Sequence, residues 1–396
     1  MHLAVITDAY PPMRTSAAVQ IRDLVAKMAA QGHQVTVLFP DCSLDQPWKL
    51  EENTRVSLLR LKAPRTKDVN YFRRALAEYR LSGCMYRNLM RSPLKTLPWD
   101  ALVWYSPTIF FGSLVSRLRK HKPCPSYLIL RDIFPEWAVD MGLLGRGLVY
   151  RYFKKVERFQ YEQADTIGVQ TPSNIEYFSN QQSGLDASVE VLNNWLSESS
   201  PGECSIRIAE TPLAGRRILT YTGNIGIAQG MDILIDLAKV LRDDDTVGFV
   251  FVGRGTAVEQ IRKRAQSFEL ENILFFDEID PAEIPGLLAQ CHVGLIALDP
   301  RHRNDNIPGK FLAYMQAGLP VLATINAGND LEVEINQNRV GRVITSNDVA
   351  ELKLQADGLL ASLATDDDFS GRCRQLAESR FSSRAAVQQI VAALKG

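Results

Sequence analysis

The stretch NIPGKFLAYMQAGLPVLA, residues 306–323, is the part of the chain that most strongly predicts its fold. Lys310 opens an apolar helix, Gly318 and Pro320 end it, and the apolar run that begins at Val321 has the composition of a buried strand. A helix N-terminus carries unpaired N–H groups and a partial positive charge, so it binds phosphate well. Because Lys310 adds a full charge in the first turn, we expect a phosphate site where this helix begins.

Apolar runs and helical patterns alternate along the rest of the chain, which predicts βαβ units and parallel sheets. We expect strands at residues 3–7, 35–39, 56–61, 101–105, 126–130, 166–170, 217–222, 248–252, 273–276, 293–297, 321–323 and 341–343. We expect helices at residues 17–31, 107–121, 147–163, 231–242, 257–268, 284–291, 310–317, 331–336, 349–364 and 382–394. This order predicts an α/β fold of doubly wound domains, whose ligands bind beyond the carboxyl ends of the strands.

The chain has 396 residues, which is the length of two ordinary domains. We expect the first domain at residues 1–195 and the second at residues 216–378. Residues 196–215 are rich in Ser, Pro, Glu and Gly and show no periodicity, so we expect a linker there. Residues 379–396 are expected to form a C-terminal helix that packs back toward the first domain.

The net charge of zero hides an uneven distribution. Residues 1–195 contain 25 Lys and Arg against 18 Asp and Glu, a net charge of +7, and the rest of the chain carries −7. Residues 60–95 contain ten basic side chains, two acidic ones, and interleaved apolar and aromatic residues. A basic helix with apolar neighbours suits a surface that rests on anionic lipid, although a solvated helical face is the simpler alternative. Nothing in the pattern favours nucleic acid binding.

The six cysteines are scattered without a C-x-x-C pair, and the five histidines are dispersed. This usage argues against a zinc site and a disulfide framework, and it fits a reducing cytosol. Residues 1–8 have no basic segment before a short apolar run, so we interpret them as a first strand and not as a signal peptide. No window of about 18 apolar residues is present, so the sequence predicts no membrane-spanning helix.

Two loops with glycines follow expected strands of the second domain. Residues 223–230 contain three glycines between a strand and a helix, which suits a bound diphosphate, although a plain tight turn has the same composition. Gly253 and Gly255 flank Arg254 at the end of the next strand. From there the guanidinium of Arg254 would bind phosphate oxygens in a bidentate manner, unless it faces solvent.

Two loops of the first domain also carry polar groups at strand ends. Residues 10–17 lead into a helix, where they either cradle a phosphate or provide an ordinary Thr or Ser cap. Residues 131–137 place Asp132 and Glu136 beside aromatic residues, and either carboxylate could orient an acceptor hydroxyl. The alternative is that Asp132 pairs with Arg131 and caps the following turn.

Two further loops of the second domain give weaker patterns. Residues 276–281 follow a strand, but their side chains do not select a ligand. Asn329 and Asp330 precede an apolar helix, which indicates an N-cap and equally fits backbone amides that contact a diphosphate. Both loops are expected at the same edge of the sheet as the helix that starts at Lys310.

In this order, the motifs resemble the retaining GT-B glycosyltransferases of family 4, which transfer a sugar from a nucleotide diphosphate sugar. The segments RDIFP, YTGNIG, IPGKF and INAGND are similar to a narrower group, the transferases of bacterial O-antigen and capsule assembly, including those for N-acetyl-L-fucosamine. The resemblance implies a GT-B fold, in which two Rossmann-like domains face each other across a cleft. It implies a UDP-sugar donor, a polyprenyl-diphosphate-linked acceptor, and no metal or other cofactor. Such an enzyme is expected to be cytoplasmic and peripheral on the inner face of the membrane.

The resemblance also implies roles for particular residues. Catalytic roles fall to Asp132, Arg254, Asp305 and Lys310. Contacts with the donor fall to Ser16, Gly223, Asn224, Gly226, Gly253, Ile279, Pro308, Gly309, Tyr314, Asn329 and Asp330. Ile279 would hold the base through its backbone, and Asp305 would contact hydroxyls of the sugar. Arg254 and Lys310 would together neutralise the diphosphate.

The chain departs from the family pattern at three places, and the first is Thr15 and Ser16, where the family usually has a pair of glycines. Asp305 and Ala313 stand where the family has two glutamates, so the carboxylate that usually holds the ribose is missing. Tyr314, Asn306 or a backbone group would have to replace it, or the ribose would be held loosely. Asn224 and Gln229 stand where many members have an arginine and a lysine that neutralise the leaving group.

Two other functions fit the same architecture. A UDP-N-acetylhexosamine 2-epimerase would need acid and base side chains on both faces of the sugar, and the sequence shows no suitable histidine and carboxylate pairs. A non-catalytic protein that binds a sugar nucleotide, or that partners another transferase, is favoured by Ala313. For a transferase, the resemblance suggests an N-acetylated or deoxy hexose as the transferred sugar.

Overall fold

The computed structural model describes residues 1–13, 15–66, 71–140, 142–182, 184–226, 229–299 and 307–396. The chain divides into two compact units, of which the first comprises Met1–Asn193 with Ser383–Gly396 and the second Asn194–Ser382. Asp305, a predicted catalytic residue, lies outside the described residues. In the described part of the chain, no helix is both long enough and apolar enough to cross a membrane.

The first unit is built on an eight-stranded sheet in the order β3-β4-β2-β1-β5-β6-β7-β8. Its strands are β1 (His2–Ile6), β2 (Gln34–Asp41), β3 (Trp48–Glu52), β4 (Val56–Lys62), β5 (Ala101–Ser106), β6 (Ser126–Leu130), β7 (Thr166–Val169) and β8 (Ser188–Val191). All neighbouring strands are parallel except β3, which pairs with β4 in the antiparallel sense. Strands β1, β5 and β6 are almost fully buried, as the continuous apolar runs predict.

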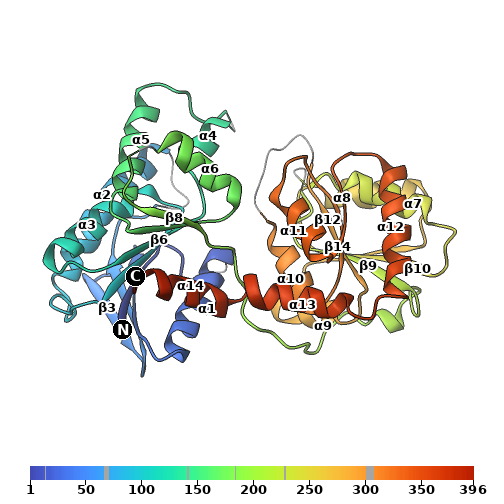
Figure 1. Cartoon of the computed structure of the whole chain (residues 1–396), viewed down its shortest axis with the longest axis horizontal. Helices are drawn as coiled ribbons and strands as arrows, with labels where there is room; N and C mark the ends of the chain where they lie inside the picture. Colours follow the sequence, from blue (N-terminus) through green and yellow to red (C-terminus); the bar gives the residue numbers. More distant parts are fainter. Residues whose placement is uncertain (14, 67–70, 141, 183, 227–228, 300–306) are drawn as a thin grey trace. The chain divides into compact units, whose positions relative to one another are not determined.

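Helices and one 3₁₀ turn connect these strands. They are α1 (Ser16–Ala30), α2 (Tyr71–Leu89), η1 (Ile109–Phe111), α3 (Gly112–His121), α4 (Glu136–Asp140), α5 (Leu148–Tyr161) and α6 (Pro172–Gln181). Helix α14 (Ser383–Ala393), at the end of the chain, packs beside α1, so both termini lie in the first unit (Figure 1). The side-chain amide of Gln389 donates to the carbonyl of Val191 over 2.8 Å, which ties α14 to the end of β8.

The second unit contains a parallel six-stranded sheet in the order β11-β10-β9-β12-β13-β14. Its strands are β9 (Arg217–Thr222), β10 (Val247–Val252), β11 (Ile273–Phe276), β12 (Val293–Ala297), β13 (Val321–Thr324) and β14 (Gly341–Ile344). Its helices are α7 (Asp232–Val240), α8 (Val258–Ser267), α9 (Ile284–Leu288), α10 (Gly309–Ala317), α11 (Asp330–Asn338), α12 (Val349–Leu363) and α13 (Phe369–Arg380). The strand order reverses between β9 and β12, which is where such sheets bind ligands. The predicted fold of two doubly wound α/β units is confirmed.

The segment 196–215, expected as a linker, packs on the second unit. Ile206, Ile208 and Leu213 are buried in the core of that unit, and Ile208 also starts a 3₁₀ turn, η2 (Ile208–Glu210). The side chain of Gln290 accepts from the N–H of Ile208 and donates to the carbonyl of Ile206, each over 2.9 Å. These apolar residues are too widely spaced to form a periodic pattern, which is why the composition alone indicated a linker.

Several short elements were not predicted. Strands β3 and β8 lie at the two edges of the first sheet, and α4, α6 and α13 connect or follow predicted elements. Edge strands pair on one side only, so β3 is built from the half-exposed, charged sequence WKLEE. Composition therefore does not distinguish β3 from a loop.

Helix α2 does not present all of its apolar residues to solvent. Leu81, Met85 and Leu89 recur every four residues and are at most 2% exposed, so this stripe belongs to the core of the first unit. Tyr86 and Met90 pack against the same core. Many of the interleaved apolar residues of segment 60–95 therefore pack in the core of the first unit. Fewer of them are left exposed for contact with a membrane.

Candidate functional site

The carboxyl edge of the second sheet brings together the loops that the sequence singled out. The loop after β9 meets the chain after β12, because a Cβ added to Gly230 would lie 3.1 Å from the Cα of Asp299. Helix α10 begins beside the same edge, and the loop after β10 lies next to the loop after β9. This edge of the second unit, described by itself, is the candidate donor site.

The start of α10 is open to a ligand. Pro308 is the N-cap in an extended conformation and offers no side-chain cap, as expected for proline. Gly309 is exposed, and nothing lies within 4 Å of a Cβ added to it. Within the described residues, the N–H groups of Gly309 and Lys310 have no hydrogen-bond partner. Unpaired N–H groups at the positive end of a helix form a site for an anion.

The side chain of Lys310 turns from this helix toward the end of β9. Its ammonium group donates to the hydroxyl of Tyr221 and lies 3.6 Å from the centroid of the Tyr221 ring. A Cβ added to Gly223 would lie 3.9 Å from Cε of Lys310, so the lysine also borders the glycine loop. Desolvation lowers the pKa of Lys310 to about 7. A phosphate at the α10 N-terminus would favour the charged form and raise this pKa.

Tyr221 is a part of the site that sequence reasoning missed. Its ring is fully buried and packs on Phe251, while its hydroxyl accepts from Lys310 and donates to the carbonyl of Asn224 over 2.8 Å. Tyr221 therefore fixes both the ammonium group of Lys310 and the loop after β9. A tyrosine inside an apolar strand is typical of a core residue. The sequence does not show which residue its hydroxyl contacts, and the folded structure does.

The glycine-rich loop after β9 is closed on itself. The side-chain oxygen of Gln229 accepts from the N–H of Gly226 over 2.9 Å and from the amide of Asn224 over 3.1 Å. The N–H groups of Gly223 and Ile225 donate to the carbonyls of Val252 and Arg254, each over 2.9 Å. Because these N–H groups already have partners, Gly223 and Gly226 do not form the predicted phosphate cradle in this conformation.

Gly253 and Gly255 are required by close packing of the two loops. A Cβ at Gly253 would lie 1.8 Å from the carbonyl oxygen of Gly223, and one at Gly255 would lie 2.2 Å from that of Ile225. Their role is therefore to let the loop after β10 pair with the loop after β9. A contact between the backbone of Gly253 and the donor stays a prediction.

Arg254 does not approach the start of α10 closely enough to make a contact there. Its side chain is 81% exposed and pairs with Glu278 over 3.1 Å between Nε and Oε2. Glu278 comes from the loop after β11, and its role was not predicted. Arg254 can still turn toward a ligand, but an anion would have to compete with Glu278, and exposed ion pairs contribute little.

Tyr314 belongs to the core and not to the donor site. It is fully buried, and its hydroxyl accepts from the N–H of Thr222 over 3.1 Å and donates to the carbonyl of Thr220 over 3.2 Å. Its ring packs against Gly294, whose added Cβ would lie 2.3 Å from the ring. The predicted contact between Tyr314 and the ribose is wrong for this conformation, because the hydroxyl is already engaged between strands.

The remaining donor residues lie at the same edge. Asn329 is buried and caps α11, since its side-chain oxygen accepts from the N–H of Leu331 over 2.9 Å. Asp330 stands in the first turn of α11 and is half-buried. Ile279 packs half-buried against the core of the unit. The N-cap alternative for Asn329 is thus confirmed, and ligand contacts by Asp330 and by the backbone of Ile279 stay predictions.

The carboxyl edge of the first sheet carries Asp132, the predicted acceptor residue, and Ser16, a predicted donor contact. Ser16 is exposed at the start of α1, where Thr15 provides the cap by accepting from the N–H of Ala18 over 3.3 Å. Asp132 follows β6 and reaches solvent, yet the protein around it desolvates the carboxylate and raises the pKa of Asp132. Arg131 opposes this shift, but it is itself buried and donates to the carbonyls of Leu192 and Asn193.

Glu136, the alternative to Asp132, has structural partners. It accepts from the hydroxyl of Tyr150 over 2.8 Å and pairs with Lys154 over 3.0 Å. Lys154 also pairs with Glu157, which is fully buried in α5. Of the two carboxylates, Asp132 is therefore the one that the structure leaves for a substrate.

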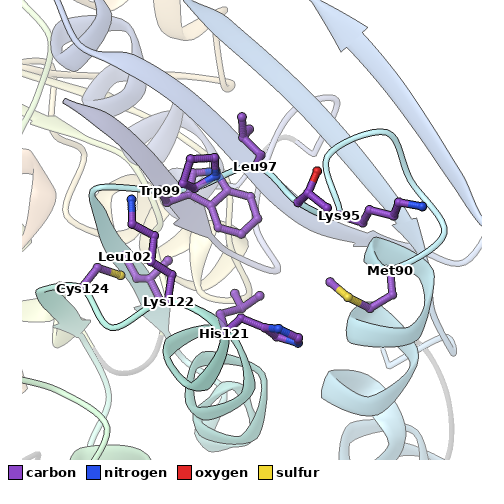
Figure 2. A pocket seen from close by; sticks show the side chains of 11 residues that line it. Met90, Lys95, Leu97, Trp99, Leu102, His121, Lys122 and Cys124 are labelled. Carbon is purple, nitrogen blue, oxygen red and sulfur yellow. The ribbon is translucent and has the colours of Figure 1, made fainter.

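A cavity of about 500 Å³ lies elsewhere in the first unit (Figure 2). Its walls include Trp99, which precedes β5, and Cys124, which precedes β6, with His121 and Lys122 nearby. It therefore lies at the amino ends of these strands. Ligands of doubly wound sheets bind at the carboxyl ends, so this cavity is not part of the candidate site.

Models of protein families match both units of the chain. Residues 216–362 match the model of glycosyl transferases group 1, and residues 15–195 match the model of a glycosyl transferase 4-like domain. The chain belongs to the group 1 glycosyltransferases. It is therefore a transferase with the GT-B fold, and the family resemblance of its motifs is confirmed.

Two curated relatives of the chain are named as glycosyltransferases. The probable glycosyltransferase WbjE of Pseudomonas aeruginosa is 24% identical over 277 residues, which cover 68% of this chain and 67% of the relative. The putative colanic acid biosynthesis glycosyl transferase WcaI of Escherichia coli K12 is 24% identical over 356 residues, which cover 81% and 83%.

Solved structures show the same fold at low identity. Sucrose-phosphate synthase from Thermosynechococcus elongatus has a TM-score of 0.72 at 15% identity, and the match covers 100% of this chain and 98% of that one. Anabaena HepE, solved in complex with UDP-glucose, has a TM-score of 0.63 at 15% identity, and the match covers 99% of each chain.

Proposed function

We propose that the protein is a retaining glycosyltransferase that moves an N-acetylated or deoxy hexose from a UDP-sugar to a polyprenyl-diphosphate-linked acceptor in O-antigen or capsule assembly. The observation that carries the donor part is the open start of α10, with Lys310 held beside it by Tyr221. The relative WcaI, which is named for colanic acid biosynthesis, supports a role in polysaccharide synthesis, and the fold shared with HepE supports UDP as the nucleotide.

The chemistry requires that the leaving diphosphate be stabilised as its charge develops. The N–H groups of Gly309 and Lys310 and the positive end of α10 would bind the phosphate oxygens. The ammonium group of Lys310 would neutralise the charge. In this proposal these groups replace a divalent metal, so the reaction needs none.

The transfer itself follows from the retaining stereochemistry that the family resemblance implies. The bond between the sugar C1 and the β-phosphate oxygen breaks, and the acceptor hydroxyl forms its bond to C1 on the same face. The leaving phosphate takes the proton of that hydroxyl. Asp132 would orient the acceptor, since its carboxylate reaches solvent at the end of β6. Asp305 would hold hydroxyls of the transferred sugar.

The setting of the reaction follows from the acceptor. A polyprenyl diphosphate is anchored in a bilayer, so we propose that the protein works at the inner face of the cytoplasmic membrane. The basic segment 60–95 would contribute to that contact through the exposed residues of α2. Binding of nucleic acid forms no part of the proposed function.

A thermal shift assay tests the donor site first. We expect UDP to raise the melting temperature more than GDP, ADP, CMP or dTDP do, and we expect a chelator to leave this shift unchanged. UDP release that requires both a UDP-sugar and a membrane extract would then establish the transfer. Binding of UDP without turnover in any such mixture would favour the non-catalytic alternative, and UDP-sugar conversion without acceptor would favour an epimerase.

A further inference from the structure

Exposed apolar side chains gather in one region of the first unit. Of the twelve large hydrophobic residues exposed among the described residues, eight lie between residues 76 and 159, which is about a fifth of the chain. These eight are Leu76, Tyr79, Trp137, Leu143, Leu148, Val149, Tyr152 and Phe159. Scattered exposed hydrophobic residues need no explanation, but a gathering of this kind marks an interaction surface.

Helix α5 carries the centre of this surface. Leu148, Tyr152 and Phe159 stand at positions i, i+4 and i+11, so they form one stripe along the helix. They are 82%, 42% and 41% exposed, respectively. Arg151 and Lys155 are exposed on the same helix and form a second stripe beside the first. The outer face of α5 is therefore apolar along one line and basic along the next.

The apolar line continues onto helix α2. A shallow depression of about 230 Å³ is lined by Tyr79 of α2 and by Tyr152 and Phe159 of α5, with Phe110 of η1 between them. Tyr79 is 67% exposed, and Leu76, on the preceding turn of α2, is 58% exposed. We call the surface formed by Leu76, Tyr79, Leu148, Tyr152 and Phe159 the α2–α5 face.

The inner face of α5 fixes this orientation. Glu157 is fully buried, pairs with Lys154, and accepts from the hydroxyls of Tyr161 and Tyr177, each over 3.1 Å. A helix that buries such a network cannot rotate to bury its outer stripe without separating these charged groups, which leaves a buried charge without its partner. Leu148 and Phe159 are thus held in solvent by the rest of the helix.

The charges around the face indicate its partner. Arg80, Arg146, Arg151 and Lys155 are exposed around it. The acidic residues of α2 and α5 that are not buried, Glu78 in α2 and Glu162 at the end of α5, are paired within their helices with Arg74 and Arg158 over 2.9 Å. Within the described part of the chain, these four basic side chains have no acidic partner, and apolar and aromatic side chains bordered by such cations match the interface of an anionic bilayer.

We propose that the α2–α5 face docks on an anionic lipid bilayer, with the apolar stripe entering the interface and the basic stripe contacting lipid phosphates. This deepens the proposed function and rests on it for the lipid-linked acceptor. It also moves the centre of the membrane contact from segment 60–95, whose Leu81, Met85 and Leu89 are core residues, to helix α5.

Vesicle flotation of the full chain tests the proposal. The probes are vesicles of phosphatidylcholine alone and of phosphatidylcholine with an equal part of phosphatidylglycerol. We expect binding to the anionic vesicles only. The triple variant Leu148→Ser, Tyr152→Ser, Phe159→Ser should lower the partition coefficient at least about tenfold. Arg151→Glu with Lys155→Glu should lower it more than about tenfold at low salt and less at high salt, because each basic residue near the surface contributes about fivefold.

The second unit offers a matched control. Val240, Val333 and Leu354 are exposed apolar residues outside the face, and replacing all three by Ser removes similar apolar area. This control should float with anionic vesicles as the unaltered chain does. The proposal would be overturned if the triple α5 variant floated with anionic vesicles as well as the unaltered chain does. It would also be overturned if the triple variant lost self-association, measured by light scattering, while its vesicle binding stayed the same.

A UDP thermal shift on the same variants separates this inference from the proposed function. The α5 triple variant should keep the full UDP shift, which also shows that it is folded. If the unaltered chain bound anionic vesicles but no UDP, the docking face would stand and the donor site would fail. If it bound UDP but no vesicles, the docking face would fail alone.

Discussion

The start of helix α10 and the glycine-rich loop after β9 lie at the same edge of the same sheet, yet among the described residues their N–H groups differ in how far they are already paired. The loop contains three glycines, but the N–H groups of Gly223 and Ile225 donate to carbonyls of the neighbouring loop, and that of Gly226 donates to Gln229. At the start of α10, Gly309 is exposed and its N–H has no partner within the described residues. The comparison teaches that unpaired donors, and not glycine content, decide where a phosphate binds.

The largest effect is expected at Lys310. Lys310→Met keeps the apolar stem of the side chain and removes the ammonium group, so the diphosphate loses its nearest full charge. We expect turnover with a UDP-sugar to fall on the order of 100-fold or more, as for loss of a donor to a developing anion. Steady-state kinetics with a UDP-release assay measures this. A loss below about threefold would mean that the charge comes from elsewhere.

Gly309 allows the helix N-terminus to be tested separately from the lysine. Proline is tolerated at the first position of a helix and removes one N–H, while alanine at the same position keeps it. Pro308 is already extended, as a residue before proline requires. We expect Gly309→Pro to bind UDP about tenfold more weakly than Gly309→Ala, measured by calorimetry. Equal affinities for the two variants would remove this N–H from the site.

Gln229 tests the other side of the comparison. Gln229→Ala breaks the two hydrogen bonds that close the loop after β9, so we expect the free energy of unfolding to fall by about 1 kcal/mol. The affinity for UDP should change by less than about threefold, since the loop is a support in this account. Urea unfolding and UDP titration measure the two effects. A large loss of UDP affinity with unchanged stability would show that the loop binds the donor directly.

The smallest effect is expected at Arg254. Because the side chain is exposed and already paired with Glu278, Arg254→Ala should weaken UDP binding by no more than about threefold. Glu278→Gln frees the guanidinium and should strengthen UDP binding slightly at low salt. The same titration with UDP measures the affinity of both variants. Losses at Arg254 as large as those at Lys310 would restore it to the catalytic role that the sequence suggested.

Among the described strands, the sequence predicted all but the edge strands β3 and β8, but it did not predict which hydrogen bonds each loop makes. Continuous apolar runs predicted the parallel strands, and the Pro-Gly-Lys start predicted α10. The burial of Tyr314 was also readable, since Phe311, Leu312, Tyr314 and Met315 follow one helical stripe and all four are buried.

Other features depend on contacts between distant residues. That Gln229 closes its own loop depends on a side-chain hydrogen bond to the backbone, which no residue pattern specifies. That Arg254 meets Glu278 depends on β10 and β11 being neighbours in the sheet. The outward orientation of Leu148 and Phe159 follows from the buried partners of Glu157, which come from α5 and the α6 region.

Proton uptake on UDP binding tests the central claim most directly. Burial lowers the pKa of Lys310 to about 7, so near pH 8 the free protein should hold this amine mostly neutral. A bound diphosphate raises the pKa of Lys310, so binding should take up most of a proton at pH 8, measured by calorimetry in buffers of different ionisation enthalpy. The Lys310→Met variant should take up almost none. Equal uptake by the two proteins, or none by either, would contradict a phosphate site at the start of α10 that is completed by Lys310.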